Sequence, residues 1–371
     1  MTLPLELVDE IIDYSVGDPS TLEKCSLVSR AWVSRCRSHL FEKCALWPST
    51  ISAFCDLLRS PECTFLYHVR SINSIKHYGP RDYDSYLNGF AGDLGRLINV
   101  RELEMTVMAP YSVEKFHTFL CTSFPKITRL VLDLRNARHS EFTLVANMIC
   151  LFPTLQELDM TMTGPSKDIP ADVVPPPELR SLHLCKHSVQ VLSWFDVAHR
   201  LSNVHSLTLP CPRGLYVPIV RKALEQIGSE LLHLDLTLPN GLERVELSQM
   251  IDLFLHQNLK TLRITDLSWI SRVEEMILWI PRLIMQLRTS ALELLTLVLP
   301  LCWPPYETLD WAALDAMLSP ARFPCLRSVV IKCEYHGDRF FYAQGRKLDT
   351  HEFVRKALPV LADSGMLQTE W

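Results

Sequence analysis

The chain has 371 residues, of which 48% are hydrophobic and 21% are charged, a balance that predicts a globular protein rather than a disordered one. Its net charge is −5 and it has no run of lysine or arginine, which argues against a nucleic-acid partner. The sequence has no uninterrupted apolar stretch long enough to cross a membrane, so we expect no membrane partner.

The 12 cysteines form no Cys-x-x-Cys pair and stand mostly within apolar runs. This usage is typical of reduced, buried thiols in an intracellular protein. Near the N-terminus, Glu6, Asp9 and Glu10 occupy positions that would be apolar in a signal peptide. We therefore expect a cytoplasmic and/or nuclear protein.

Residues 3–41 predict three short helices. Pro4 suits the first turn of a helix, and the apolar residues that follow recur at helical spacing. The sequence Gly17-Asp18-Pro19 ends this helix and begins a second one, in which Ser20 and Glu23 have the spacing of a capping box. A third helix ends near Phe41. Such a small unit cannot bury all its apolar side chains, so we expect some of these residues to await a partner: Leu3, Leu7, Leu27, Val28 and Trp32.

Two motifs stand at the ends of this segment: Leu3-Pro4-x-Glu6-Leu7 and Leu27-Val28-Ser29-Arg30-x-Trp32. In residues and spacing they resemble the F-box, which in its family docks on the small adaptor subunit of cullin–RING ubiquitin ligases. The alternative interpretation is an ordinary helical N-terminal cap. The resemblance implies the following adaptor-binding residues: Leu3, Pro4, Glu6, Leu7, Ile11, Leu27, Val28, Ser29 and Trp32.

A repeated pattern, L-x-x-L-x-L with apolar substitutes, follows a linking helix that is predicted within residues 46–58 and starts near Ser49. A weaker copy at Val69 and Ile72 opens the series. The copies are separated by 24 to 34 residues, which overlaps the range of leucine-rich repeats. The nine clear copies begin at Val100, Ile127, Leu155, Leu179, Val204, Leu231, Leu259, Leu292 and Leu326.

The last two apolar positions of each copy alternate with polar ones, as in a half-buried strand. Helical patterns lie between the strands, at 113–120, 142–151, 189–197, 217–227 and 247–255. A strand followed by a helix, repeated, predicts parallel strands whose neighbours must stack to bury their apolar faces. We expect an α/β fold in which the helical unit (1–45) and a linking helix (46–65) precede a solenoid (66–371) with strands inside and helices outside.

The repeats depart from the leucine-rich-repeat family in one respect: most copies lack the asparagine that usually follows the third leucine. We therefore expect an irregular solenoid. Residues 162–174 predict a surface loop. After the last copy, His336-Gly337-Asp338 predicts a turn, and residues 350–361 predict a helix that Pro359 kinks or ends. We interpret this end as a cap over the last repeat.

The sequence has no catalytic signature of the kinds that bind nucleotides, hold zinc or carry a serine nucleophile, and we expect neither an enzyme nor a cofactor. His183, Cys185 and His187 lie close together, but a polar strand surface explains them better than a metal site does. The whole chain thus resembles an F-box protein with degenerate leucine-rich repeats, of the fungal type.

The resemblance implies the substrate-recognition subunit of a cullin–RING (SCF-type) ubiquitin ligase, with an unknown protein target on the repeats. The alternative is a non-catalytic scaffold or regulatory F-box protein that delivers no target. The polar positions between the repeat leucines should face the inside of the solenoid, acidic in the early repeats, neutral in the middle and weakly basic, with Arg263 and Lys332, at the end. We expect the target to contact Glu102, Glu104, Asp133, Glu157, Asp159, His183, His233 and Asp235.

Overall fold

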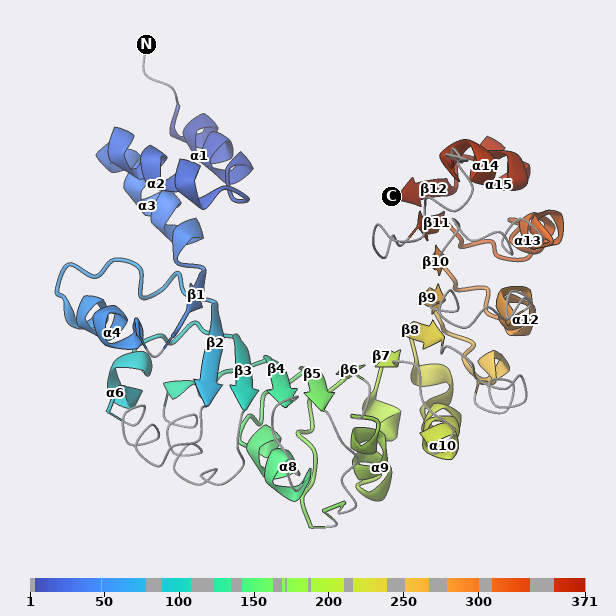
Figure 1. Cartoon of the computed structure of the whole chain (residues 1–371), viewed down its shortest axis with the longest axis horizontal. Coiled ribbons are helices and arrows are strands. Elements are labelled where there is room, and N and C mark those ends of the chain that lie inside the picture. The colour runs from blue at the N-terminus through green and yellow to red at the C-terminus, as the bar shows by residue number, and fades with distance from the viewer. Residues whose placement is uncertain are drawn as a thin grey trace, which may run out of the picture. The chain divides into compact units, whose positions relative to one another are not determined.

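The structure is a computed structural model that describes these residues: 4–47, 49–77, 89–107, 123–134, 142–162, 169–170, 172–185, 188–209, 216–238, 251–266, 279–299, 309–333 and 350–370. It divides into two compact units, Met1–Leu179 and Arg180–Trp371. Figure 1 labels their helices and strands. Several predicted features lie wholly or partly outside the described residues: the helix at 113–120, residues 163–168 and 171 of the loop at 162–174, the start of the helix at 247–255 and the turn at 336–338.

The first unit begins with the three predicted helices, α1 (Leu5–Tyr14), α2 (Pro19–Val28) and α3 (Arg30–Leu40). The predicted capping box is wrong. Asp18 is the N-cap of α2, and its carboxylate accepts hydrogen bonds from the backbone N–H groups of Ser20 and Thr21. Pro19 then occupies the first helical position, where its missing N–H removes no bond. Ser29 separates α2 from α3 and caps α3 by accepting from the N–H of Ala31.

These helices have a small core of their own, formed by Val8, Ile12, Leu22 and Cys36. Three partly buried side chains pack against it: Cys25, Trp32 and Leu40. Cys36 is fully buried, in keeping with the core role expected from its apolar neighbours. With so few buried side chains, the unit leaves most of its other apolar residues at the surface.

A short strand that the sequence pattern did not predict, β1 (Lys43–Ala45), follows α3 and pairs in parallel with β2 (Ser71–His77). Next along the chain, α4 (Ile51–Arg59) is the linking helix, beginning two residues later than expected. Cys44 and Leu46 on either side of the β1 terminus are buried. The sheet therefore begins within the range 1–45 that the sequence assigns to the helical unit.

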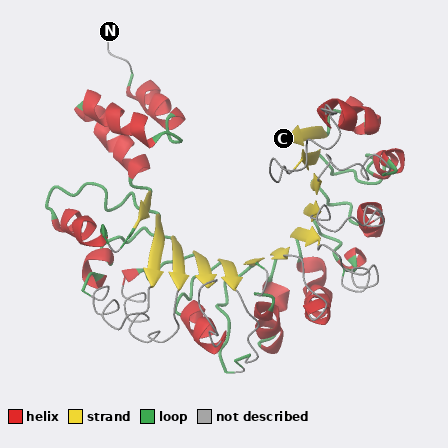
Figure 2. Ribbon diagram, in the orientation of Figure 1, coloured by secondary structure: helices red, strands yellow, loops and turns green. Residues whose placement is uncertain are grey.

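The remaining strands of the first unit confirm the repeat pattern. They are β3 (Glu102–Val107), β4 (Arg129–Leu134) and β5 (Glu157–Met162), and each pairs in parallel with its predecessor. The repeat leucines are buried on one side of the strands, and the helices α6 (Ala91–Leu94) and α8 (Phe142–Cys150) lie on that side (Figure 2). The strand face turned away from the helices, which we call the open face, bears the polar residues.

The second unit repeats this arrangement with seven parallel strands among its described residues. The strands are β6 (Ser181–Leu184), β7 (Ser206–Leu209), β8 (His233–Leu238), β9 (Thr261–Asp266), β10 (Leu294–Leu299), β11 (Ser328–Cys333) and β12 (Leu367–Glu370). The α-helices are α9 (Gln190–Val197), α10 (Val217–Ile227), α12 (Trp279–Gln286), α13 (Trp311–Met317), α14 (Thr350–Ala357) and α15 (Pro359–Asp363), and short 3-10 turns include η5 (Leu253–Leu255). The helices predicted at 142–151, 189–197 and 217–227 are thus confirmed.

Backbone hydrogen bonds join neighbouring repeats, most of which lack the usual asparagine. Before most of the strands, the preceding carbonyl accepts two N–H groups from the next repeat: that of Arg101 accepts from Thr128 and Arg129, and that of Lys260 from Glu293 and Leu294. Polar side chains just before the first repeat leucine add a second link, since Asn258 donates to the Ser229 carbonyl. Neighbouring repeats are therefore tied together although their lengths differ.

The predicted C-terminal cap proves to be one more repeat-like element. Pro359 ends α14 as expected, but it also opens α15, and the chain then adds β12 in parallel beside β11. The series of strands thus does not close at residues 326–331. Asp315 of α13 holds this end: its carboxylate oxygens accept from the N–H groups of Val360 at 2.8 Å and Leu361 at 3.1 Å.

Replacing Asp315 with alanine should loosen α15 and β12. Asp315 is 3% exposed, so the change leaves two N–H groups at the α15 N-terminus without their acceptor. We expect a loss of about 2–4 kcal/mol in the free energy of unfolding, with faster hydrogen exchange at residues 367–370. Asp363→Ala, at an exposed position of α15, is the control. Equal exchange in both variants would contradict a holding role for Asp315.

Candidate interaction surfaces

The first helix presents an apolar stripe to solvent. Leu7, Ile11 and Tyr14 are spaced by four and three residues, which places them on one side of α1, whereas Val8 and Ile12 on the adjoining side enter the core. All three are exposed, and Tyr14 is 92% exposed. Tyr14 is not among the residues predicted to await a partner, although its helical spacing from Leu7 and Ile11 indicates the same side of the helix.

The junction of α2 and α3 presents a second apolar surface. Leu27 is 87% exposed and Val28 is 66% exposed. Three other residues of the F-box-like motifs are also exposed: Pro4, Glu6 and Ser29, the last of which caps α3. Leu3 lies outside the described residues. Trp32 is partly buried against the core of the helices, so only the rest of its side chain is accessible to a partner.

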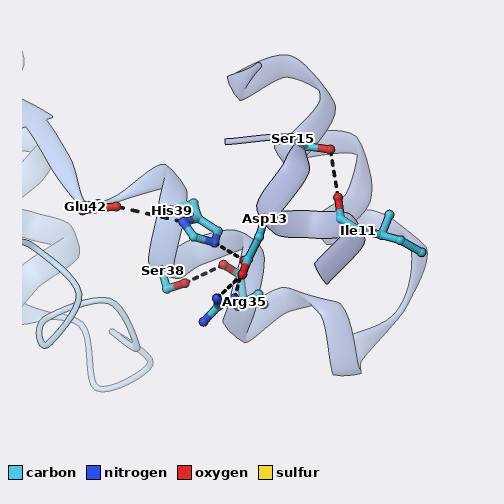
Figure 3. Close-up of polar contacts among 7 residues, drawn as sticks. All are labelled: Ile11, Asp13, Ser15, Arg35, Ser38, His39 and Glu42. Atoms are coloured by element: carbon cyan, nitrogen blue, oxygen red, sulfur yellow. Dashed lines mark hydrogen bonds and ion pairs between the residues drawn. The ribbon is translucent and has the colours of Figure 1, made fainter. Parts of the chain in front are cut away.

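A polar cluster ties α1 to α3 (Figure 3). The Asp13 carboxylate accepts two hydrogen bonds from the Arg35 guanidinium, at 2.7 Å from Nε and 2.5 Å from Nη2, and a third from His39 Nε2 at 2.7 Å. The bonds from Arg35, and next those from His39, lower the pKa of Asp13 from 3.8 to about 2. The other ring nitrogen of His39 lies 4.0 Å from Glu42, which extends the cluster towards β1.

Acid should weaken the docking of α1 on α3. Because the folded-state pKa of Asp13 is about 2 and lies below its usual 3.8, the contribution of this carboxylate is complete above pH 3.8 and is lost as the pH falls through about 2. Melting followed by circular dichroism, from about pH 5 down to about pH 2, compares the wild type with Asp13→Asn. We expect the stability difference between them to shrink on acidification. A difference that stays constant would refute this.

A cleft of about 510 Å³ lies beside this cluster. Its lining carries both signs of charge, from Asp9, Arg35, Glu42 and Arg70. Two arginines therefore face two carboxylates, and the formal charges of these four groups cancel. We assign this cleft no ligand.

On the open face of the first unit, the strand register sorts the predicted target-binding residues into three rows across β3, β4 and β5. The first row is Glu102, Arg129 and Glu157; the second is Glu104, Val131 and Asp159; the third is Thr106, Asp133 and Thr161. Arg129 Nε lies 3.6 Å from Glu102 and 3.7 Å from Glu157. These rows hold five carboxylates and one guanidinium, a formal charge of −4.

The register also determines how these acids are spaced. Their carboxylates do not stand side by side, because no two of them occupy neighbouring strands in the same row. In the first two rows the acids are on β3 and β5, with a residue of β4 between them. The face is acidic, but its negative charge is divided into separate positions.

The open face of the second unit bears neutral polar contacts on its early strands. His183 shares a hydrogen bond of 3.1 Å with Thr208, and His233 shares one of 2.9 Å with Thr261. Asp235 lies 3.6 Å from Arg263 Nε. Burial raises the pKa of Asp235, and Arg263 and then His183 partly offset this rise. Burial, and next the positive charge of Lys260, lower the pKa of His233.

The predicted basic end of the face is not found. Arg263 is paired with Asp235, and Lys332 forms an ion pair with Glu370 on β12, a strand that the repeat pattern does not predict. Thr296, at a polar position between two repeat leucines, is buried together with Val298 and Val330. The open face is therefore acidic in the first unit and neutral in the second, and the predicted basic end is absent from the described residues.

The possible metal site at residues 183–187 gains no support. His183 is bonded to Thr208, Cys185 is exposed and His187 lies outside the described residues. Within the described ranges, no three His, Cys, Asp or Glu side chains gather closely enough to hold a metal ion. In the same part of the chain, none of the helices combines the length and the apolar character that a bilayer span requires.

Parallel strands in chain order, with helices on one side of each unit, define a leucine-rich-repeat-like α/β fold. A solved structure with a similar fold is the leucine-rich repeat-containing protein LegL7 from Legionella pneumophila. The likeness has a TM-score of 0.51 at 14% sequence identity, and it covers 85% of this chain and 97% of that chain. No protein-family model and no curated protein matches the sequence. At this identity, the likeness shows the fold alone.

Proposed function

We propose that this protein is the substrate-recognition subunit of a cullin–RING (SCF-type) ubiquitin ligase. The observation that carries the proposal is the apolar surface of the three-helix unit. Leu7, Ile11, Leu27 and Val28 belong to the F-box-like segment and are exposed, although this unit has a core of its own. Exposed apolar side chains of this size, gathered on two small surfaces, favour a protein partner.

In this proposal the two parts of the chain have different partners. The helices α1 to α3 bind the adaptor subunit, and the open faces of the repeats bind a protein target. The protein carries out no chemistry itself. It raises the concentration of the target near the ubiquitin-carrying enzyme, which is sufficient to accelerate the transfer.

The test is direct binding of the full chain to a purified adaptor subunit, measured by isothermal titration calorimetry. We expect a one-to-one complex whose formation has a negative heat-capacity change, because apolar surface is buried. No binding at micromolar concentrations would reject the proposal. A second measurement separates target delivery from a scaffold role: the abundance of proteins bound to the repeats should rise when the cullin is inactivated, and an unchanged abundance favours the scaffold.

A further inference from the structure

The first row of the open face shows how this sheet holds a cationic side chain. Arg129 projects from β4, the middle strand, between carboxylates on the two strands beside it. Its Nε atom is 3.6 Å from Glu102 and 3.7 Å from Glu157. Neighbouring parallel strands are about 4.8 Å apart, so carboxylates on β3 and β5 leave room for one guanidinium or ammonium group between them.

The second row also has carboxylates on β3 and β5, but the residue of β4 between them is not a cation. Glu104 on β3 and Asp159 on β5 stand directly beside Val131 of β4, two residues further along each strand and therefore on the same face. The structure shows neither carboxylate in a hydrogen bond or an ion pair with any residue that it describes. Val131 is half-buried, so an apolar patch separates the two acids.

We propose that Glu104, Val131 and Asp159 form a subsite for one lysine or arginine side chain from a basic, extended segment of the target. Two facing carboxylates would not by themselves define a site; the neighbouring row, where the same three strands already hold a guanidinium, indicates the ligand. The aliphatic part of the incoming side chain packs on Val131, and its charged end lies between the carboxylates. This inference rests on the proposed function, because it assigns the target rather than the adaptor.

Charge complementarity places the subsite in the first unit. The three rows of β3 to β5 have a formal charge of −4, whereas in the second unit Arg263 is paired with Asp235 and Lys332 with Glu370. A basic segment therefore gains more from the first face than from the second. Such a contact mainly accelerates association, and salt weakens it.

The sharpest test places an arginine of the chain itself in the subsite. Val131→Arg gives the second row the arrangement of the first, with an arginine between two carboxylates, and should block the subsite. Val131→Gln adds side-chain length without charge. A second variant, Glu104→Gln/Asp159→Asn, removes the charges at nearly unchanged volume. Glu230→Gln/Asp363→Asn changes the net charge by the same amount at exposed positions of the second unit and serves as the control.

The probes are fluorescein-labelled peptides of glycine and serine that carry one to three arginines, with citrulline replacing arginine in matched peptides. We expect the arginine peptides to bind the wild type and the control variant. Their affinity should fall about tenfold, as for a charge-assisted contact, in Val131→Arg and in the Glu104/Asp159 variant, and it should fall much less in Val131→Gln.

Three outcomes overturn the inference: arginine peptides that do not bind, citrulline peptides that bind equally well, or full affinity in both the Val131→Arg and the Glu104/Asp159 variants. Adaptor affinity, measured on the same preparations, keeps this result separate from the proposed function. Normal adaptor binding with failed peptide binding rejects the subsite alone. Lost adaptor binding in the wild type rejects the proposed ligase role.

Discussion

Replacing Leu27 with aspartate is expected to reduce binding of the adaptor subunit by about a hundredfold or more, while the chain stays folded. Leu27 is 87% exposed near the end of α2, so its loss removes almost no packing from the free protein. In a complex that buries this side chain, the change removes about 1.5–3 kcal/mol of apolar burial. It also places a carboxylate where water is excluded, which adds a desolvation cost.

The control for this experiment is Leu57→Asp. Leu57 is 53% exposed on α4, so the same substitution tests a leucine outside the F-box-like segment. Calorimetric titration with the adaptor should give wild-type affinity for Leu57→Asp and no measurable heat for Leu27→Asp. If folded Leu27→Asp binds as tightly as the wild type, the α2–α3 junction is not the adaptor surface.

Removing the helical unit is expected to have very different consequences according to where the chain is cut. A chain of residues 41–371 keeps β1, and it also keeps Phe41, whose ring stacks on Phe65 with centroids 4.1 Å apart. A chain of residues 47–371 loses these contacts together with the buried Cys44 and Leu46. We expect the second chain to be less stable by about 3–6 kcal/mol, from lost apolar burial and lost strand bonds.

The cut after residue 46 also moves the edge of the sheet from β1, which has three residues, to β2, which has seven. The N–H and C=O groups of β2 that pair with β1 then have no strand beside them, and a longer exposed edge promotes aggregation. Thermal melting and light scattering on the two chains measure both effects. The longer chain should melt cooperatively as a monomer and fail to bind the adaptor. Equal cooperativity in both chains would show that the repeats begin after residue 46, as the sequence pattern suggests.

The sequence alone determined the repeat architecture. Each strand from β3 to β11 begins two residues after the first apolar position of its L-x-x-L-x-L copy, as Glu102 follows Val100. The alternation of apolar and polar residues is a local property, and burial of one face is its direct consequence, so neighbouring sequence was sufficient. The same holds for α1, whose Val8 and Ile12 enter the core.

Local sequence could not show the strands β1 and β12, which are three and four residues long and contain no complete repeat. Each is a strand because the backbone of a neighbouring strand offers it hydrogen bonds. The start of α2 is another such case, since Asp18 and Ser20 are both good capping residues and the geometry of the turn selected Asp18.

The tertiary structure alone decided which polar residues meet on the open face. Aligning the L-x-x-L-x-L copies gives Glu102, Arg129 and Glu157 the same position in each copy, but the alignment does not show whether neighbouring strands pair without a shift, and the pairing of β2 with β3 contains one. Hydrogen bonds between strands fix the register, and the register places Arg129 between two carboxylates and Val131 between two others. A shift of one residue in one strand would separate these groups, because it would turn that strand's side chains to the opposite face.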